Sequence, residues 1–404
     1  MPCKTKLIPL ADRGPLRVMF IITSMPVGGA EVLLVNLIRK MNRERILPEL
    51  CCLKSLGPLG EELAREIPVF SNLLTSKYDL RVFPRLCRLL RSRRIDAVVT
   101  VGAGDKMFWG RLAAWWCQAP VVLSALHSTG WPDVIGRLNR MLTPLTDRFI
   151  AVAQPHGRYL AEVERFPEEK ICVIPNGVDT DRFTPGQGVQ IRRELGLAGD
   201  VPIAGIVAAL RPEKDHELFL KAAALVRRTL PTAHFLVVGD GPLRQKLEST
   251  AAELGVSDAV HFLGTRQDIP ETLRAMDVFV LSSKMEANPV SILEAMSTAT
   301  PVVASAVGSI GESVQDGVTG FLLPPGSVEQ FADRIGQLLR NRGLAVEMGS
   351  AGRDFVVKHC SLDGMVRGYE QLLEEVYSQK CTRQRTANRS LEQPSFEPQA
   401  VSPR

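Results

Sequence analysis

Features that would place this chain in several common protein classes are scarce or absent. The 404 residues contain no run of about eighteen apolar residues, so no membrane-spanning helix is expected. The short apolar stretch near the N-terminus is broken by Pro9, Asp12 and Arg13, which makes it a poor signal peptide. The eight cysteines form no Cys-x-x-Cys pair, which favours reduced thiols over a disulfide scaffold or a zinc site. We therefore expect a cytoplasmic protein.

Two ligand classes lack their usual sequence signals. The net charge of +5 is modest, and no zinc finger, RNA-binding aromatic strand or helix-turn-helix pattern stands out, so nucleic acid is not an expected partner. No Gly-x-Gly-x-x-Gly follows the first apolar strand, which counts against an NAD-dependent oxidoreductase. With 45% hydrophobic and 23% charged residues, the composition is typical of a globular protein, and the length suggests roughly two to three domains.

The chain does contain two successive alternations of short apolar runs with longer amphipathic runs. The strands predicted in the first half are 17–23, 50–53, 68–70, 96–101, 120–124 and 148–152. Those predicted in the second half are 202–208, 234–238, 260–262, 278–281, 301–304 and 320–323. This pattern predicts an α/β fold of two doubly wound, Rossmann-like domains with a cleft between them.

The same pattern gives the expected division of the chain. We predict an N-terminal extension (1–15), a first domain (16–180), a linker with one short helix (181–200), a second domain (201–360), a C-terminal helix that could cross back to the first domain (361–379), and a disordered tail (380–404).

The most informative segment covers residues 284–304 and carries two carboxylates, Glu286 and Glu294, with seven residues between them. Apolar strands flank it, and Pro289 fits the first turn of a helix between those strands. Glu286 is then expected in a loop at the carboxyl end of a strand, where open α/β sheets bind ligands. The free N–H groups of 290–292 would form an anion site suited to a diphosphate. The spacing alone is weak evidence, because a solvated Glu286 and an ordinary helical Glu294 would also produce it.

Four motifs occur in order along the chain: Gly28-Gly29-Ala30-Glu31, Ile174-Pro-Asn-Gly-Val-Asp179 with Phe183, Val238-Gly-Asp-Gly-Pro242, and Glu286 to Glu294 followed by Ala295-Met296 and Pro301-Val-Val303. Together they resemble the retaining glycosyltransferases of family 4 (glycosyl transferases group 1), which have the GT-B fold. The resemblance implies a UDP- or GDP-sugar donor on the second domain, an acceptor mainly on the first, and domain closure. It also implies no cofactor and no metal, so helix N-termini and cationic side chains would neutralise the diphosphate.

The resemblance further implies roles for individual residues around Glu286, which would hydrogen-bond the donor sugar and act with His127 at the reacting centre. His127 is expected at the cleft edge after the strand at 120–124, although a lone histidine is more often structural. The other expected donor-binding residues are Gly28, Gly29, Arg211, Lys214, Gly239, Asp240, Arg266, Asn288, Val290, Ser291 and Glu294.

Several of these assignments have a structural alternative. Gly29 would let the backbone approach a phosphate or sugar, or would only form a tight turn. Lys214 would balance phosphate charge, or would be a solvated lysine. The chain departs from the family pattern at Ala209, where an arginine is usual, and we expect Arg211 to supply that charge. Asp240 is a candidate helix cap.

Asp179-Thr-Asp181 has the Asp-x-Asp form of a metal site, but it lies inside the Pro-Asn-Gly-Val-Asp motif. We therefore expect Asp179 to fix an interdomain turn.

The acceptor is indicated only indirectly. Residues 77–94 combine six arginines and a lysine with one apolar face, and Trp109, Trp115 and Trp116 follow. A solvated basic helix is one reading, and a surface for an anionic membrane or a phosphate-bearing lipid acceptor is the other. The sequence thus predicts a retaining, metal-independent glycosyltransferase acting on a glycan or a lipid-linked acceptor. The rival functions are a GT-B nucleotide-sugar epimerase and a catalytically inactive nucleotide-sugar-binding protein.

Overall fold

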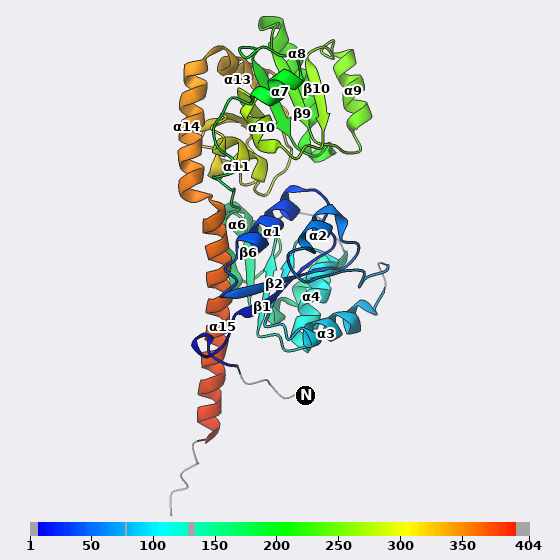
Figure 1. The fold of residues 1–404 in the computed structure, drawn as a ribbon, viewed down its shortest axis with the longest axis vertical. Helices are drawn as coiled ribbons and strands as arrows, with labels where there is room; N and C mark the ends of the chain where they lie inside the picture. Colours follow the sequence, from blue (N-terminus) through cyan, green and yellow to red (C-terminus); the bar gives the residue numbers. More distant parts are fainter. Residues whose placement is uncertain (1–6, 77–78, 128–133, 393–404) are drawn as a thin grey trace, which may run out of the picture.

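The computed structural model describes residues 7–76, 79–127 and 134–392, and it contains two α/β domains (Figure 1). The first domain has a seven-stranded parallel sheet in the order β3-β2-β1-β4-β5-β6-β7. Its strands are β1 (Leu16–Ile22), β2 (Ile46–Cys52), β3 (Val69–Phe70), β4 (Ala97–Val101), β5 (Val121–Ala125), β6 (Arg148–Ala151) and β7 (Ile171–Val173). Its helices are α1 (Gly29–Lys40), α2 (Gly57–Leu63), α3 (Val82–Ser92), α4 (Asp105–Trp116), α5 (Val134–Met141) and α6 (Gln154–Glu162).

The second domain repeats this architecture with a six-stranded parallel sheet in the order β10-β9-β8-β11-β12-β13. Its strands are β8 (Ile203–Val207), β9 (His234–Val238), β10 (Val260–Gly264), β11 (Val278–Leu281), β12 (Val302–Ser305) and β13 (Gly320–Leu323). Its helices are α7 (Val189–Glu194), α8 (His216–Thr229), α9 (Arg244–Glu253), α10 (Ile269–Arg274), α11 (Val290–Ser297), α12 (Ile310–Ser313), α13 (Val328–Arg340) and α14 (Arg342–His359). The predicted pair of doubly wound sheets is therefore confirmed.

The strands are almost continuously apolar because helices cover both faces of each sheet. In β1, for example, Phe20 packs in one core cluster with α1, while Ile21 faces a second cluster formed with α3 and α4. The second domain has one large cluster that includes Phe235 and Phe279. These cores fix the strand ends, which carry the site.

Each sheet reverses its strand order beside its first strand, between β1 and β4 in the first domain and between β8 and β11 in the second. The loops that leave the carboxyl ends of such neighbouring strands separate and leave a crevice, which is where α/β proteins of this type bind ligands. A crevice of this kind is therefore expected in each domain, at the reversal of its strand order.

The long helix α15 (Leu362–Glu392) returns to the first domain and runs alongside it (Figure 1). Tyr369 and Leu373 of α15 are buried in the same core cluster as β1 and α1. The crossing is tied to the earlier interdomain segment, because Val178 N–H donates to the Cys360 carbonyl and Leu362 N–H to the Val178 carbonyl, each at 2.9 Å. Within the described ranges, no helix combines the length and apolar character needed to cross a membrane.

The prediction of a disordered tail from residue 380 is wrong for its first part, since α15 continues to Glu392. Lys380 Nζ lies 2.6 Å from the Asp147 carboxylate, and Cys381 is buried. These contacts hold the additional turns on the first domain, although the surrounding composition of Arg, Ser and Gln indicates disorder. Residues 393–404 lie outside the described part of the chain.

Candidate active site

Glu286 lies in the loop after β11, in the crevice of the second domain. Its carboxylate is 9% exposed, and Oε1 accepts a hydrogen bond from Ser283 Oγ at 2.7 Å. Lys214 Nζ contacts the same oxygen at 2.5 Å. The other carboxylate oxygen has no protein partner among the described residues, so it is available to a ligand hydroxyl. The structure thus brings the predicted Glu286 and Lys214 together, from loops 72 residues apart.

Lys214 itself is held by the loop that follows β8. Ser282 Oγ donates to the carbonyls of Lys214 at 3.1 Å and of Asp215 at 2.9 Å, so the end of β11 fixes the loop after β8. Arg211 begins this loop with an exposed side chain. Burial raises the pKa of Glu31, on the first domain, and the charge of Arg211 is close enough to offset part of this rise.

Helix α11 begins behind Glu286, after the N-cap residue Pro289. The N–H groups of Val290 and Ser291 have no carbonyl partner within the described chain, as expected in a first helical turn. Ile292 N–H donates to the Pro289 carbonyl at 3.2 Å, so the predicted anion site of three free N–H groups contains two. Both remaining donors belong to half-buried residues beside Glu286.

Glu294 lies one turn further along α11. Burial raises the pKa of its carboxyl to about 7, and the charge of Arg182 offsets this only in part. No described residue forms a hydrogen bond or ion pair with this carboxylate. A carboxylate in this state is stabilised by any ligand that donates hydrogen bonds to it.

His127 follows β5 on the first domain. Burial lowers the pKa of its imidazole to about 4, and the nearby His156 and Lys106 act in the same direction, so the ring is neutral at neutral pH. Its Nδ1 is buried and has no partner among the described residues. The loop after it, 128–133, lies outside the described ranges.

Gly28 and Gly29 lie after β1, at the start of α1. A Cβ atom at Gly28 would lie 2.5 Å from Oε2 of Glu31, whereas a Cβ atom at Gly29 would have nothing within 4 Å. The space beside Gly29 is therefore open, which agrees with a ligand approaching this backbone.

Hydrogen bonds join the two sides of the cleft close to Glu286. Asn288 Nδ2 donates to the Val152 carbonyl at 3.0 Å, and Asn176 Nδ2 donates to the Asn288 carbonyl at 2.9 Å. Gln154 N–H donates to the Glu312 carboxylate at 3.0 Å. The side-chain amide of Asn288, predicted to bind the donor, is therefore used between the domains, and only its Oδ1 is without a partner.

Comparison with known proteins decides the family. A family model described as Glycosyltransferase Family 4 matches residues 27–182, and one described as Glycosyl transferases group 1 matches residues 189–355. D-inositol 3-phosphate glycosyltransferase of Nocardia farcinica is 30% identical over 351 residues, which cover 83% of this chain and 74% of that protein. The chain belongs to glycosyltransferase family 4. It is thus a glycosyltransferase, and the fold and family indicated by the sequence are confirmed.

Two further comparisons extend over most of this glycosyltransferase. The UDP-Gal:alpha-D-GlcNAc-diphosphoundecaprenol alpha-1,3-galactosyltransferase of Escherichia coli is 28% identical over 300 residues, which cover 70% of this chain and 77% of that enzyme. The crystal structure of Anabaena HepE in complex with UDP and glucose superposes with a TM-score of 0.79 at 22% identity, over 89% of this chain and all of that one. The second likeness concerns the fold.

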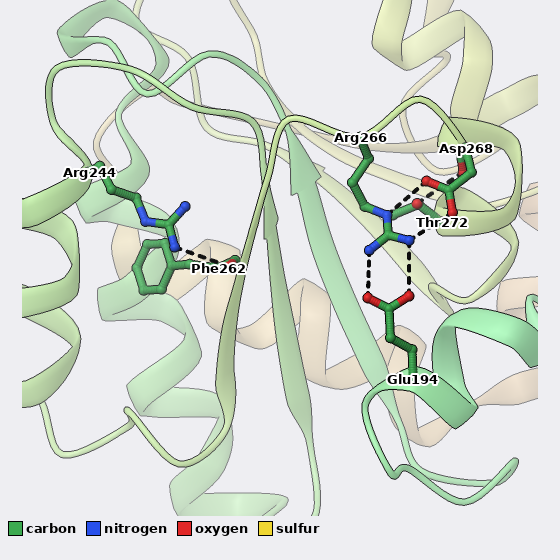
Figure 2. A network of polar contacts seen from close by, with 6 residues as sticks. All are labelled: Glu194, Arg244, Phe262, Arg266, Asp268 and Thr272. Atoms are coloured by element: carbon green, nitrogen blue, oxygen red, sulfur yellow. Dashed lines mark hydrogen bonds and ion pairs between the residues drawn. The ribbon is translucent and has the colours of Figure 1, made fainter.

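The side chain of Arg266 pairs with two carboxylates of this glycosyltransferase. Its guanidinium makes paired hydrogen bonds to Glu194 at 2.8 and 3.0 Å and to Asp268 at 2.8 Å each (Figure 2). Only 16% of the side chain is exposed. These hydrogen bonds use four of the five N–H donors of the guanidinium, and one on Nη1 has no partner among the described residues. In the described geometry this side chain therefore joins the end of α7 to Asp268, the residue before α10, and its contact with the donor stays a prediction.

Gly239 and Asp240 brace the loop that carries Arg211. A Cβ atom at Gly239, where φ is +132°, would lie 2.1 Å from the Ala208 carbonyl oxygen. The Asp240 carbonyl accepts from Leu210 N–H at 3.0 Å, and its Oδ1 from Gly241 N–H at 2.7 Å. Asp240 caps no helix, since α9 begins only at Arg244.

Asp179 fixes a turn as expected, because its Oδ1 accepts hydrogen bonds from the N–H groups of residues 181 and 182.

Two charged residues that no prediction named as binding residues, Lys106 and Glu31, lie in the first turns of α4 and α1. Both lie at strand ends of the first domain, near His127. Glu31 belongs to the motif Gly28-Gly29-Ala30-Glu31, of which only the glycines were predicted to bind the donor. Lys106 belongs to no motif. Only the pairing of β4 with β1 places these two side chains together.

Proposed function

We propose that this glycosyltransferase moves a sugar from a UDP- or GDP-sugar to a hydroxyl of a glycan or lipid-linked acceptor, with retention of the anomeric configuration and without a divalent metal. The observation that carries the proposal is the contact between Glu286 and Lys214 beside the free N–H groups of α11. These groups lie together where the strand order of the second domain reverses. The carboxylate suits the sugar, whereas the cation and the two N–H donors suit the diphosphate.

In this arrangement the donor would lie across the second domain. The diphosphate would bind the N–H groups of Val290 and Ser291, with Lys214 and Arg211 balancing its charge. The ribose would donate hydrogen bonds to Glu294, and the donor sugar would donate to Glu286. These cations can stabilise the leaving diphosphate as the glycosidic bond breaks, which is the task that a metal has in other transferases.

The first domain would contribute to the reacting centre. His127, as a neutral imidazole, can donate one hydrogen bond and accept another, which suits a sugar hydroxyl. The hydrogen bonds of Asn288 and Glu312 to the first domain hold the two sides together in this state. Closure of this kind excludes water that would hydrolyse the donor.

A nucleotide titration tests the proposal. UDP and GDP are titrated into the wild-type protein by calorimetry without added metal, and then into Lys214→Ala, Arg211→Ala and the control Lys221→Ala. Lys221 is exposed on α8. We expect one nucleotide to bind and both site variants to bind it at least tenfold more weakly, with no change in the control. Failure of both nucleotides to bind would refute the donor site. Nucleotide binding with neither donor hydrolysis nor transfer would favour the inactive binding protein, and conversion of the donor into its epimer would favour the epimerase.

A second part of the proposal concerns contact with an anionic membrane, through a basic aromatic surface on α3 and α4. Its exposed members are Leu80, Arg81, Arg88, Arg91, Trp115 and Trp116. Leu80 is 70% exposed, and Trp115 and Trp116 are 51% and 52% exposed, so these side chains are not core residues. Aromatic side chains beside arginines suit the boundary between lipid headgroups and acyl chains. Lys77 lies outside the described residues.

Part of the predicted basic helix is structural. Arg85 Nη1 lies 2.8 Å from Asp79, and Arg93 Nε lies 2.8 Å from the buried Glu49. The remaining arginines are the ones that would meet lipid. Pelleting with phosphatidylcholine vesicles, with and without phosphatidylglycerol, tests this. We expect salt-sensitive binding only to the anionic vesicles and its loss in Trp115→Ser/Trp116→Ser. Absence of binding by the wild type would refute membrane contact and leave the donor site untouched.

A further inference from the structure

The crevice of the first domain contains charged groups that the proposed donor site does not use. It lies between β1 and β4, where the strand order of this sheet reverses. Glu31 follows β1, Lys106 follows β4, and His127 follows the neighbouring β5. Because the carboxyl ends of parallel strands share one edge of the sheet, these three groups face the second domain from one place.

The position of Lys106 is set by the turn before it. Gly102 has φ of +86°, and a Cβ atom there would lie 2.7 Å from Cε and 2.9 Å from Nζ of Lys106. The lysine side chain is therefore folded back over the end of β4, on a backbone that only glycine leaves uncovered. In this folded-back conformation Nζ stays at the crevice, whereas an extended lysine side chain would reach solvent.

Neither charge has a side-chain hydrogen bond or ion pair among the described residues. Lys106 Nζ has no hydrogen bond or ion pair to a described residue, and burial lowers its pKa. Burial raises the pKa of Glu31. Among the described residues its carboxylate accepts a hydrogen bond from its own backbone N–H and is attracted at longer range by Lys106 and Arg211. Half-buried charges without direct partners destabilise a protein unless a ligand completes them.

We propose that Lys106 and Glu31 form the acceptor subsite and that the acceptor carries a phosphate group close to its reacting hydroxyl. This rests on the proposed function. Lys106 Nζ would donate to a phosphate oxygen, and Glu31 would accept from a hydroxyl of the same molecule. Hydrogen bonds of this charge-assisted type are the strongest available to either group. The donor diphosphate has its own cations, Lys214 and Arg211, on the opposite side of the cleft.

The test uses inorganic phosphate and glucose 1-phosphate as probes. The protein is first saturated with UDP, or with GDP if that is the nucleotide that binds, so that the probes cannot occupy the donor site. Phosphorus NMR line broadening then gives the affinity of each probe for the wild type, Lys106→Met, Glu31→Gln and the control Lys221→Met. The nucleotide affinity and Tm of each variant are measured in parallel.

We expect both probes to bind the wild type and Lys106→Met to bind them at least tenfold more weakly, with an unchanged nucleotide affinity. Glu31→Gln should weaken glucose 1-phosphate and leave inorganic phosphate unaffected. Probes that do not bind the wild type, or that bind Lys106→Met equally well, would overturn the inference. So would a Lys106→Met variant that loses nucleotide affinity, because Lys106 would then belong to the donor site. If neither nucleotide binds, the proposed function fails first, and titration of the free protein still tests Lys106.

Discussion

The two sides of the cleft differ in how completely their charged groups are satisfied. On the second domain, Glu286 is already bonded to Lys214 and Ser283, and the loop of Lys214 is braced by Ser282. On the first domain, the charges of Lys106 and Glu31 lack direct partners among the described side chains. The second domain is therefore the prepared side, with its charges paired before a ligand arrives. On the first domain the proposed acceptor would supply the partners.

This difference matches the two tasks of a transferase. Charge develops on the diphosphate when the donor bond breaks, and groups that are fixed beforehand stabilise it without reorganising. An acceptor must be chosen among many polyols, and unsatisfied buried groups reject molecules that cannot complete them. Substitutions on the second domain should therefore reduce the rate, whereas those around Lys106 should alter the choice of acceptor.

The largest effect is expected for Glu286→Gln. The amide removes the charge that faces the donor sugar and leaves Lys214 without its ion pair. We expect transfer to fall by about 10²–10³-fold, the range found when one preorganised electrostatic group is removed. The assay measures sugar transfer, or donor hydrolysis until an acceptor is known. Glu329→Gln, on an exposed residue of α13, is the matched control and should keep full activity. Wild-type rates in Glu286→Gln would contradict the assigned role.

Substitutions at two glycines compare an open position, Gly29, with a tightly packed position, Gly308. A Cβ atom at Gly308, where φ is +58°, would lie 1.7 Å from the Glu286 carbonyl oxygen, whereas one at Gly29 would meet nothing within 4 Å. Gly308→Ala should lower the free energy of unfolding by roughly 1–3 kcal/mol and displace Glu286. Gly29→Val should leave Tm nearly unchanged and raise the KM of the donor severalfold, by filling the open space. Thermal unfolding and donor kinetics measure both. An equal loss of stability in the two variants would refute the contrast.

The sequence predicts the site residues on the second domain better than the charged groups on the first domain, for a physical reason. Glu286, Pro289 and the flanking strands are close in sequence, so local rules for strand, turn and helix place them in the loop and at the helix start. Continuous apolar runs likewise identified twelve of the thirteen strands; only β7, at Ile171–Val173, is missing from the predicted set, because its three residues lead directly into a turn.

Features that depend on distant contacts were missed or misread. The position of Lys106 near Glu31 follows only from the pairing of β4 with β1, which lies about 80 residues earlier in the chain. The ion pair of Arg266 was missed because its partner Glu194 lies in α7, 72 residues earlier in the chain. Helix α15 extends past residue 380 because Lys380 meets Asp147, more than 200 residues earlier. Long-range pairing and ion pairs of this kind leave no periodic signal in the sequence.

The smallest effect is expected for Glu294→Gln, and it depends on pH. Burial raises the pKa of this carboxyl to about 7, above its ordinary value of 4.5, so between these values the folded protein binds more protons than the unfolded chain. Stability contributed by this group is therefore complete below about pH 4.5 and is lost as the pH rises toward 7. The amide cannot ionise, so Glu294→Gln should have a higher Tm than the wild type at pH 8 and nearly the same Tm at pH 5. Nucleotide should reverse the order at pH 8, because the ribose hydroxyls donate to the ionised carboxylate and not equally to the amide. Thermal unfolding at both pH values, with and without the nucleotide that binds, measures this. An equal Tm difference at pH 5 and pH 8 would show that the carboxyl is ionised in the folded protein throughout, and that the prepared side already satisfies it.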